Sequence, residues 1–197
     1  MPLCDLSIKY RAGKIKTYLL INVHYSVYHN QLRLYEDKPI YFDNWDIDMY
    51  YVEKSWPVDE LVSMRWSEDG PVRTTLELEY RCNQSTIWQK IHFYANTPRI
   101  DFETKADWKE HQHLLKAEFP VDIHSDEATF EIQFGNVTRK VHTNTSWDKA
   151  RFESCGQKWM DFSEGHYGVS LLNDCKYGHS VRDGVIGLTL IKCGVEP

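Results

Sequence analysis

The sequence predicts an all-β protein, a large antiparallel β-sandwich with little helix. Nearly every regular segment alternates apolar and polar residues, as a half-buried strand does. Clusters of turn residues, such as Asp69-Gly70-Pro71 and Asp183-Gly184, separate these segments. No apolar stripe with helical spacing reaches the length of an average helix. Several short strands joined by turns are typical of a β-sandwich.

The predicted strands follow from these patterns in order. Segments 76–81, 87–94 and 100–108 place apolar residues on one face and charged or polar residues on the other. Segments 115–121 and 185–191 complete the set of predicted strands and are separated from the others by turn signals. Segment 128–134 places Phe130, Ile132 and Phe134 on one side, and 169–172 is an apolar strand that ends at Asn173-Asp174. Segment 59–66 is expected to form at most a turn or two of helix.

Composition narrows the class of protein. With 197 residues, the chain is long enough for one large all-β domain, or for one domain with an extension. A net charge of −6 without a basic cluster argues against nucleic acid as a partner. No apolar run is long enough to cross a bilayer, so no membrane partner is expected.

The cysteines and the first residues bear on the compartment. Five cysteines without a close pair fit neither a disulfide framework nor a CxxC metal motif. The first 20 residues lack the apolar core and basic flank of a signal peptide. We therefore expect reduced cysteines and a cytoplasmic location.

Two short clusters combine carboxylates with aromatic rings, as a sugar-binding surface requires. Trp45, Asp46 and Asp48 form the first cluster, and the second follows the strand at 169–172. Carboxylates can accept hydrogen bonds from sugar hydroxyls, and rings can stack on the C–H faces of sugars. The alternative is structural: the rings pack and the aspartates cap loop amides.

Other groups of residues are weaker candidates for a catalytic or metal site. Asp46 with Asp48, Asp161 with Glu164, and Asp148 with Asp174 are the carboxylate pairs that a glycosidase would need. Each of these residues also suits a loop or a turn. His111 and His113 lack further zinc ligands, so a solvated strand end is expected there. Nucleophile-elbow and phosphate-loop motifs are absent from the sequence.

Several sequence blocks, in one order, resemble the C-terminal β-domain of the family 38 α-mannosidases, most closely their cytosolic and bacterial branch. The resemblance runs from about Leu32 to Lys192. It includes the blocks Leu34-Tyr35-Glu36-Asp37-Lys38-Pro39, Trp45-Asp46-Ile47-Asp48, Pro98-Arg99-Ile100-Asp101-Phe102, Leu114-Leu115-Lys116-Ala117-Glu118-Phe119-Pro120, Asn144-Thr145-Ser146-Trp147-Asp148 and Leu171-Leu172-Asn173-Asp174.

The resemblance implies a mannosidase supersandwich, similar to galactose mutarotase, that packs on an N-terminal catalytic domain. That domain would supply the aspartate nucleophile, the second carboxylic acid and one zinc ion. None of these motifs has a matching position here, so no catalytic or metal residue is assigned to this chain. The resemblance implies six substrate-binding residues in two loops: Trp45, Asp46, Asp48, Asp174, Lys176 and Tyr177.

The same comparison suggests a division of the chain. Residues 1–30 match the family poorly, whereas residues 31–197 correspond to the β-sandwich domain, truncated at its C-terminal end. The leading hypothesis is therefore a part of an α-mannosidase that is inactive in isolation. It would bind mannose-containing oligosaccharides together with its catalytic α/β domain, and would tend to self-associate when alone. The alternatives are a free-standing carbohydrate-binding module and a remnant that folds without a function.

Overall fold

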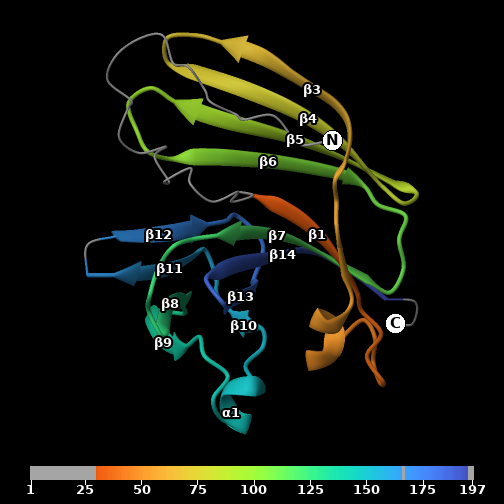
Figure 1. The fold of residues 1–197 in the computed structure, drawn as a ribbon, viewed down its shortest axis with the longest axis vertical. Coiled ribbons are helices and arrows are strands. Elements are labelled where there is room, and N and C mark those ends of the chain that lie inside the picture. Colours follow the sequence, from red (N-terminus) through yellow and green to blue (C-terminus); the bar gives the residue numbers. More distant parts are fainter. Residues whose placement is uncertain (1–29, 166, 195–197) are drawn as a thin grey trace.

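The computed structural model describes residues 30–165 and 167–194, and these form three antiparallel sheets (Figure 1). Strands make up about 58% of the chain and helix about 5%, which confirms the prediction of an all-β sandwich with little helix. The helical parts are a 3-10 helix, η1 (Met49–Glu53), and a single-turn α-helix, α1 (Ser146–Lys149). Residues 1–29 lie outside the described ranges, so the predicted division near residue 30 stays a prediction.

The sheets differ in strand length and position, and we name them central, upper and lower after Figure 1. The central sheet has the order β10 (Ser154–Cys155), β13 (Gly178–Arg182), β14 (Val185–Cys193), β7 (His113–Pro120), β1 (Gln31–Glu36) and β2 (Ser55–Pro57). The upper sheet has the order β3 (Glu60–Asp69), β4 (Arg73–Cys82), β5 (Ser85–Tyr94) and β6 (Ile100–Asp107). The lower sheet has the order β12 (Tyr167–Leu172), β11 (Trp159–Glu164), β8 (Glu127–Ile132) and β9 (Gly135–Lys140).

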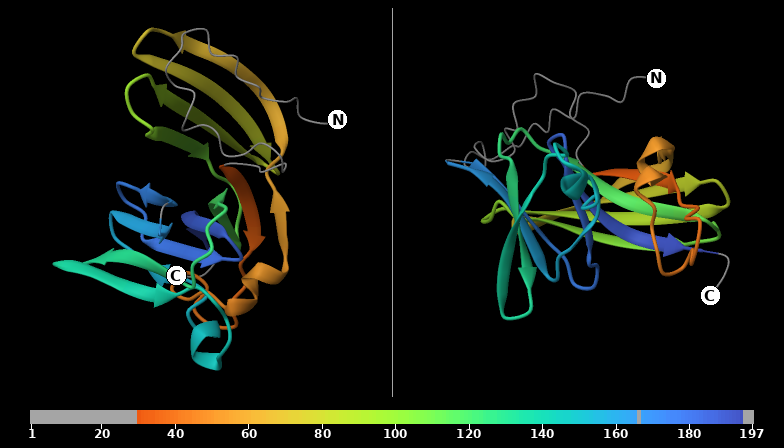
Figure 2. Two further views of the ribbon diagram at one scale, coloured as in Figure 1. Left: turned by 60° about the vertical axis from the view of Figure 1, so that its left-hand side comes forward. Right: turned by 90° about the horizontal axis from the view of Figure 1, so that it is seen from below.

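One face of the central sheet packs against both of the other sheets. Leu115 and Ala117 of β7 lie in a core with Ile87 of the upper sheet. On the same face, Ile186 of β14 lies in a second core with Phe130 and other side chains of the lower sheet. Alternate residues of a strand point to the same face, so β7 and β14 supply both cores at once. The two four-stranded sheets are thus held on one shared apolar surface. Figure 2 shows the three sheets from two further sides.

The opposite face of the central sheet is covered by η1 and the segment before β10. Tyr35 of β1, Leu114 of β7 and Tyr51 of η1 are buried there, with Phe152 packed against them. This face also contains Lys116, which has 1% of its surface exposed. A buried cation needs hydrogen-bonded partners, and the covering elements provide them.

The structure confirms most predicted strands and corrects two segments. Segment 59–66 lies in strand β3, where two irregularities in its pairing with β4 interrupt the period-two pattern. Segment 128–134 is not one strand, because β8 ends at Ile132. Ile132 pairs with Gly135, the first residue of β9, across a tight turn. Phe134 lies in that turn with a φ of 63° and a fully exposed ring, rather than on an apolar face.

β14 lies inside the central sheet, where it pairs with β13 on one side and with β7 on the other. The edges of the central sheet are β10 and β2. Within the described ranges, no helix is long and apolar enough to span a membrane.

Candidate functional site

The first predicted cluster lies in the loop between β1 and η1. The backbone amides of Trp45 and Asp46 both donate to Phe42 O, at 2.8 and 2.9 Å, so the loop closes on itself. It is attached to the end of β14, because Lys192 Nζ donates to Asp43 O and the Gly194 amide donates to Asn44 Oδ1. The six-stranded sheet therefore holds this loop at its border.

This loop exposes an unusual number of apolar side chains. Trp45 is 85% exposed, and Ile40, Tyr41 and Phe42 are 72–77% exposed. Tyr50, in the adjoining η1, is 63% exposed. Phe42 also has a φ of 55°, a left-handed conformation that costs free energy in a residue other than glycine. An exposed apolar loop of this kind is typical of an interaction site.

The two aspartates of the loop cap backbone amides. Asp46 Oδ1 accepts from the Ile47 amide at 2.9 Å, and Asp48 Oδ2 accepts from the Ile40 amide at 3.1 Å. Each carboxylate oxygen can accept more than one hydrogen bond, so these contacts fix the loop and leave acceptor capacity.

The second cluster lies between β12 and β13. Asn173 Oδ1 accepts from the Lys176 amide at 2.7 Å, which gives the loop an Asx-type turn. A hydrogen bond from the Cys175 thiol, followed by the loop amide, lowers the pKa of the exposed Asp174 below its usual range. Tyr177 is 49% exposed, and Lys158 Nζ lies 6.0 Å from the centre of its ring. The side chains of Asp174, Lys176 and Tyr177 reach solvent rather than the core.

Buried groups connect the parts of the chain that follow the two loops. Tyr51 Oη, in η1, donates to Glu153 Oε1 at 2.7 Å, and Lys116 Nζ donates to the same oxygen. Lys116 also donates to Ser180 Oγ at 2.8 Å. Burial, followed by the neighbouring Glu153, raises the pKa of Tyr51, so its hydroxyl stays a donor. The charged side chain of Lys116 thereby joins η1 to β13.

The backbone is closely packed where β13 begins. A Cβ at Gly178 would lie 3.2 Å from Thr189 and 3.4 Å from Glu153 Oε2. Thr189 Oγ1 and Glu153 Oε2 are buried without a hydrogen-bond partner. The second loop therefore ends against a tightly packed polar region.

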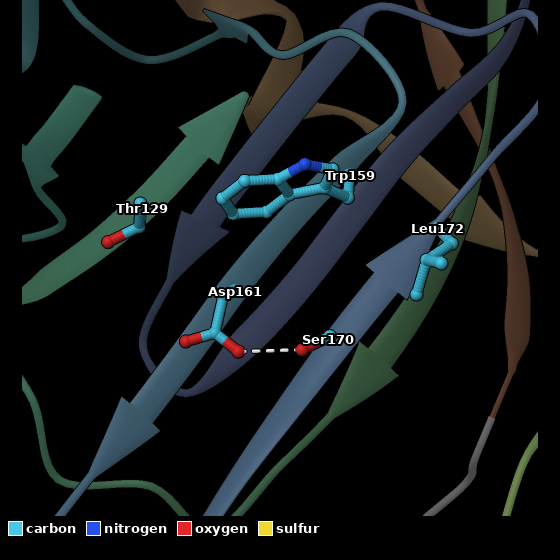
Figure 3. Close-up of a pocket in the computed structure, with 5 residues that line it drawn as sticks. All are labelled: Thr129, Trp159, Asp161, Ser170 and Leu172. Carbon is cyan, nitrogen blue, oxygen red and sulfur yellow. Dashed lines mark hydrogen bonds between the residues drawn. The ribbon is translucent and has the colours of Figure 1, made fainter. Parts of the chain in front are cut away.

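A shallow hollow of about 420 Å³ lies on the outer face of the lower sheet. Figure 3 shows Trp159 and Asp161 on β11, with Ser170 and Leu172 on the neighbouring strand β12 and Thr129 on β8. The Trp159 indole extends over the sheet toward the strand that carries Thr129 (Figure 3). The sequence predicts Asp161 only as a partner of Glu164. It does not predict the hollow, because the hollow is assembled by pairing between separate strands.

The structure separates or reassigns the proposed carboxylate pairs. Asp161 and Glu164 are three positions apart on β11 and so point to opposite faces. Asp148 forms a capping box with Thr145 at the start of α1. Among residues 30–165 and 167–194, no group of three or more His, Cys, Asp or Glu side chains could hold a metal ion.

The six predicted substrate-binding residues thus fall into two loops of three. Trp45, Asp46 and Asp48 border the end of β14, and the other three border the start of β13. Their exposure is compatible with ligand contacts, and their roles stay predictions.

Comparisons with known proteins identify the family. Residues 2–197 match the family model described as the glycosyl hydrolases family 38 C-terminal domain. The chain is 39% identical over 170 residues to human alpha-mannosidase 2C1 and 35% identical over 176 residues to an alpha-mannosidase of Saccharomyces cerevisiae. Each match covers 85% of this chain but only 16% of the relative.

A solved structure shows the same fold. The crystal structure of an alpha-mannosidase from Enterococcus faecalis V583 matches with a TM-score of 0.73 at 14% identity, over 85% of this chain and 22% of that chain. The family resemblance of the sequence blocks is confirmed, and the chain belongs to the C-terminal domain family of the family 38 glycosyl hydrolases.

Proposed function

We propose that this chain acts as the β-domain of an α-mannosidase and completes the sugar site of an adjoining catalytic domain. The observation that carries this proposal is the 39% identity to an alpha-mannosidase of which the chain spans 16%. Hydrolysis of mannose-containing oligosaccharides would then be a property of the assembled enzyme.

The exposed loop between β1 and η1 supports a contact with another domain. Its apolar side chains, including Trp45 and Phe42, lie in solvent and would be buried on docking. Burial of apolar surface contributes about 25 cal/mol per Å², so such a loop can stabilise a domain interface.

The six loop residues would take complementary roles toward a mannoside. Asp46, Asp48 and Asp174 would accept hydrogen bonds from hydroxyls, and Lys176 would donate one. Trp45 and Tyr177 would offer ring faces. The described part of this chain has no group of side chains that fits a zinc ion. The family resemblance supports a catalytic domain that supplies the zinc and the nucleophile.

A domain exchange tests the proposal. The corresponding β-domain of human alpha-mannosidase 2C1 is replaced by this chain, and hydrolysis of p-nitrophenyl α-mannoside is measured with zinc present. We expect turnover by the chimera and none by this chain alone. A chimera that assembles, as judged by gel filtration, but does not hydrolyse the substrate contradicts the proposal.

The second loop gives a sharper test in the same chimera. Asp174→Asn and Lys176→Met should each lower kcat/KM about tenfold to a hundredfold, since a charged hydrogen bond contributes about 1.5–3 kcal/mol. Their melting temperatures should stay unchanged, because both side chains lie at the surface. A lowered melting temperature with unchanged kinetics would make the loop structural.

The proposed location is the cytoplasm. The four cysteines within the described part of the chain (Cys82, Cys155, Cys175 and Cys193) are free, as expected of a reducing compartment. A fluorescent fusion expressed in eukaryotic cells should distribute through the cytosol. Its electrophoretic mobility should not change on treatment with an endoglycosidase, because a cytosolic protein carries no N-linked glycans.

A further inference from the structure

A row of polar side chains crosses the outer face of the lower sheet from edge to edge. Thr138 of β9 pairs with Thr129 of β8, Thr129 pairs with Asp161 of β11, and Asp161 pairs with Ser170 of β12. Paired residues on neighbouring strands are about 5 Å apart and point to the same face. The row is thus a continuous line of hydroxyls with one carboxylate in it.

Asp161 is fixed within this row by two hydroxyl groups. Ser170 Oγ donates to Asp161 Oδ1 at 2.6 Å, and Ser163 Oγ donates to Asp161 Oδ2. A Cβ at Gly168, which faces Ser163 across the strand pair, would overlap the serine side chain. The glycine therefore makes room for the serine that orients the carboxylate.

The indole of Trp159 lies next to this row. Trp159 and Asp161 are two positions apart on β11, so they share the outer face at a separation of about 6.6 Å along the strand. That separation is comparable with the width of a pyranose ring. A ring stacked on the indole would bring its hydroxyls over Asp161 and Ser170.

The hydrogen-bonding capacity of the face matches a polyol. Each Asp161 oxygen accepts one serine hydroxyl and keeps one further lone pair, while Ser170 and Thr129 keep lone pairs of their own. A cation site would instead require negative charge that is not already compensated. Here the hydroxyls of Ser163 and Ser170 already donate to the single carboxylate, Asp161. Pockets with an apolar wall and a few convergent polar groups are typical of small-ligand sites.

We infer that this hollow is a second saccharide-binding platform, which takes a neutral pyranoside with adjacent hydroxyls. Trp159 stacks on the C–H face of the sugar, and Asp161 accepts from two of its hydroxyls. The platform consists only of lower-sheet residues and shares none with the two loops. Lys158, whose Nζ lies 6.0 Å from the centre of the Tyr177 ring, is not among the residues that line the hollow. Sugar binding by the platform can therefore be tested without the catalytic domain.

The test uses the whole 197-residue chain labelled with 5-fluorotryptophan, which gives seven ¹⁹F signals. Titration with methyl α-D-mannopyranoside should shift the Trp159 signal, assigned from its loss in Trp159→Phe, with saturation in the millimolar range typical of shallow single-sugar sites. Asp161→Asn should weaken binding about tenfold or more, because a charged acceptor becomes an amide. The other fluorotryptophan signals of that variant report whether it is folded.

Trp88→Ala is the matched control. Trp88 is 38% exposed on the outer face of the upper sheet, outside the hollow, and Lys105 Nζ lies 5.7 Å from the centre of its ring. This variant should keep the affinity of the unmodified chain. Tetramethylammonium chloride, which carries charge without hydroxyls, should not shift the Trp159 signal.

Three results overturn the inference. The first is no saturable shift of Trp159 at sugar concentrations far above a millimolar dissociation constant. The second is an equal shift with tetramethylammonium, which would make the hollow a cation site. The third is a Trp159 signal that shifts with protein concentration alone while the other six tryptophan signals do not shift, which would make this face a protein interface.

Discussion

At the scale of single residues, the buried side chain of His179 stabilises the loop between β12 and β13. It is fully buried, its Nδ1 lies 3.2 Å from Tyr177 O, and its ring packs edge-on against Phe130. A Cβ at Gly156 would approach Nδ1 to 3.0 Å, so the pocket has no spare room. Burial lowers the pKa of His179 below its usual value, so folded His179 stays neutral to a lower pH than an unfolded histidine does.

This predicts an acid-sensitive stability. An unfolded histidine takes up a proton as the pH falls through about 6.5, whereas folded His179 does not until a lower pH. The stabilisation is thus complete above pH 6.5 and decreases below it. His179→Gln should flatten the dependence of the melting temperature on pH between 7 and 5. His124→Gln, at an exposed site, is the control, and an unchanged slope in His179→Gln would contradict the assignment.

Phe42 gives a prediction on the balance between stability and function. Its φ of 55° favours asparagine or glycine, and its 72% exposed ring contributes little to the fold of this chain. Phe42→Asn should stabilise the isolated chain by about 1 kcal/mol in chemical denaturation. The same change should reduce the activity of the chimera, since the ring would be buried against the catalytic domain. A destabilised isolated chain would show that Phe42 packs within its own domain.

At the scale of elements, one charged group fastens η1 and the segment before β10 to the central sheet. Lys116 Nζ contacts Glu153, Ser180 Oγ and Tyr51 Oη, and so joins β7, β13 and η1. The lysine side chain is 1% exposed and that of Glu153 is 13% exposed. Loss of one partner would leave the other charge buried without compensation.

Lys116→Met should therefore destabilise the chain by about 3–5 kcal/mol, measured by urea denaturation. The double variant Lys116→Met with Glu153→Gln should recover a substantial part, because no unpaired charge remains. Lys140→Met is the control: Lys140 forms surface ion pairs with Asp126 and Glu127, so its loss should change stability little. Equal effects of the single and double variants would argue against charge compensation.

At the scale of the whole molecule, the segment from Ile40 to Tyr50 carries a cluster of exposed apolar residues that adjoin one another along the chain. Between Ile40 and Tyr50, five large side chains are at least 63% exposed. An isolated domain with such a surface tends to bind copies of itself.

We therefore expect the isolated chain to self-associate in light scattering and to bind an apolar dye. The double variant Phe42→Asn with Trp45→Ser should lower both signals. Phe134→Ser, which removes a fully exposed ring from the β8–β9 turn, should leave them unchanged. A monomer at high concentration without dye binding would contradict the docking role of the loop.

The sequence predicts the sandwich because burial on one face imposes period two on β4, β5 and β6. It fails at β3, where irregular pairing shifts the alternation, and at Phe134, whose apolar character hides a turn. It also predicts two loops from local composition. It cannot predict the Thr129–Asp161–Ser170 row, because only pairing between separate strands brings these residues together.

The place of β14 has a consequence for synthesis on the ribosome. Translation delivers β7 and β13 first, yet these strands become part of one sheet only when residues 185–193 insert between them. Until then β7 has β1 on one side and a bare edge on the other, next to apolar residues such as Leu115. Pairing between strands far apart in the sequence is slow, and transient edges recruit other chains. The nascent polypeptide should therefore depend on chaperones until β14 emerges from the exit tunnel.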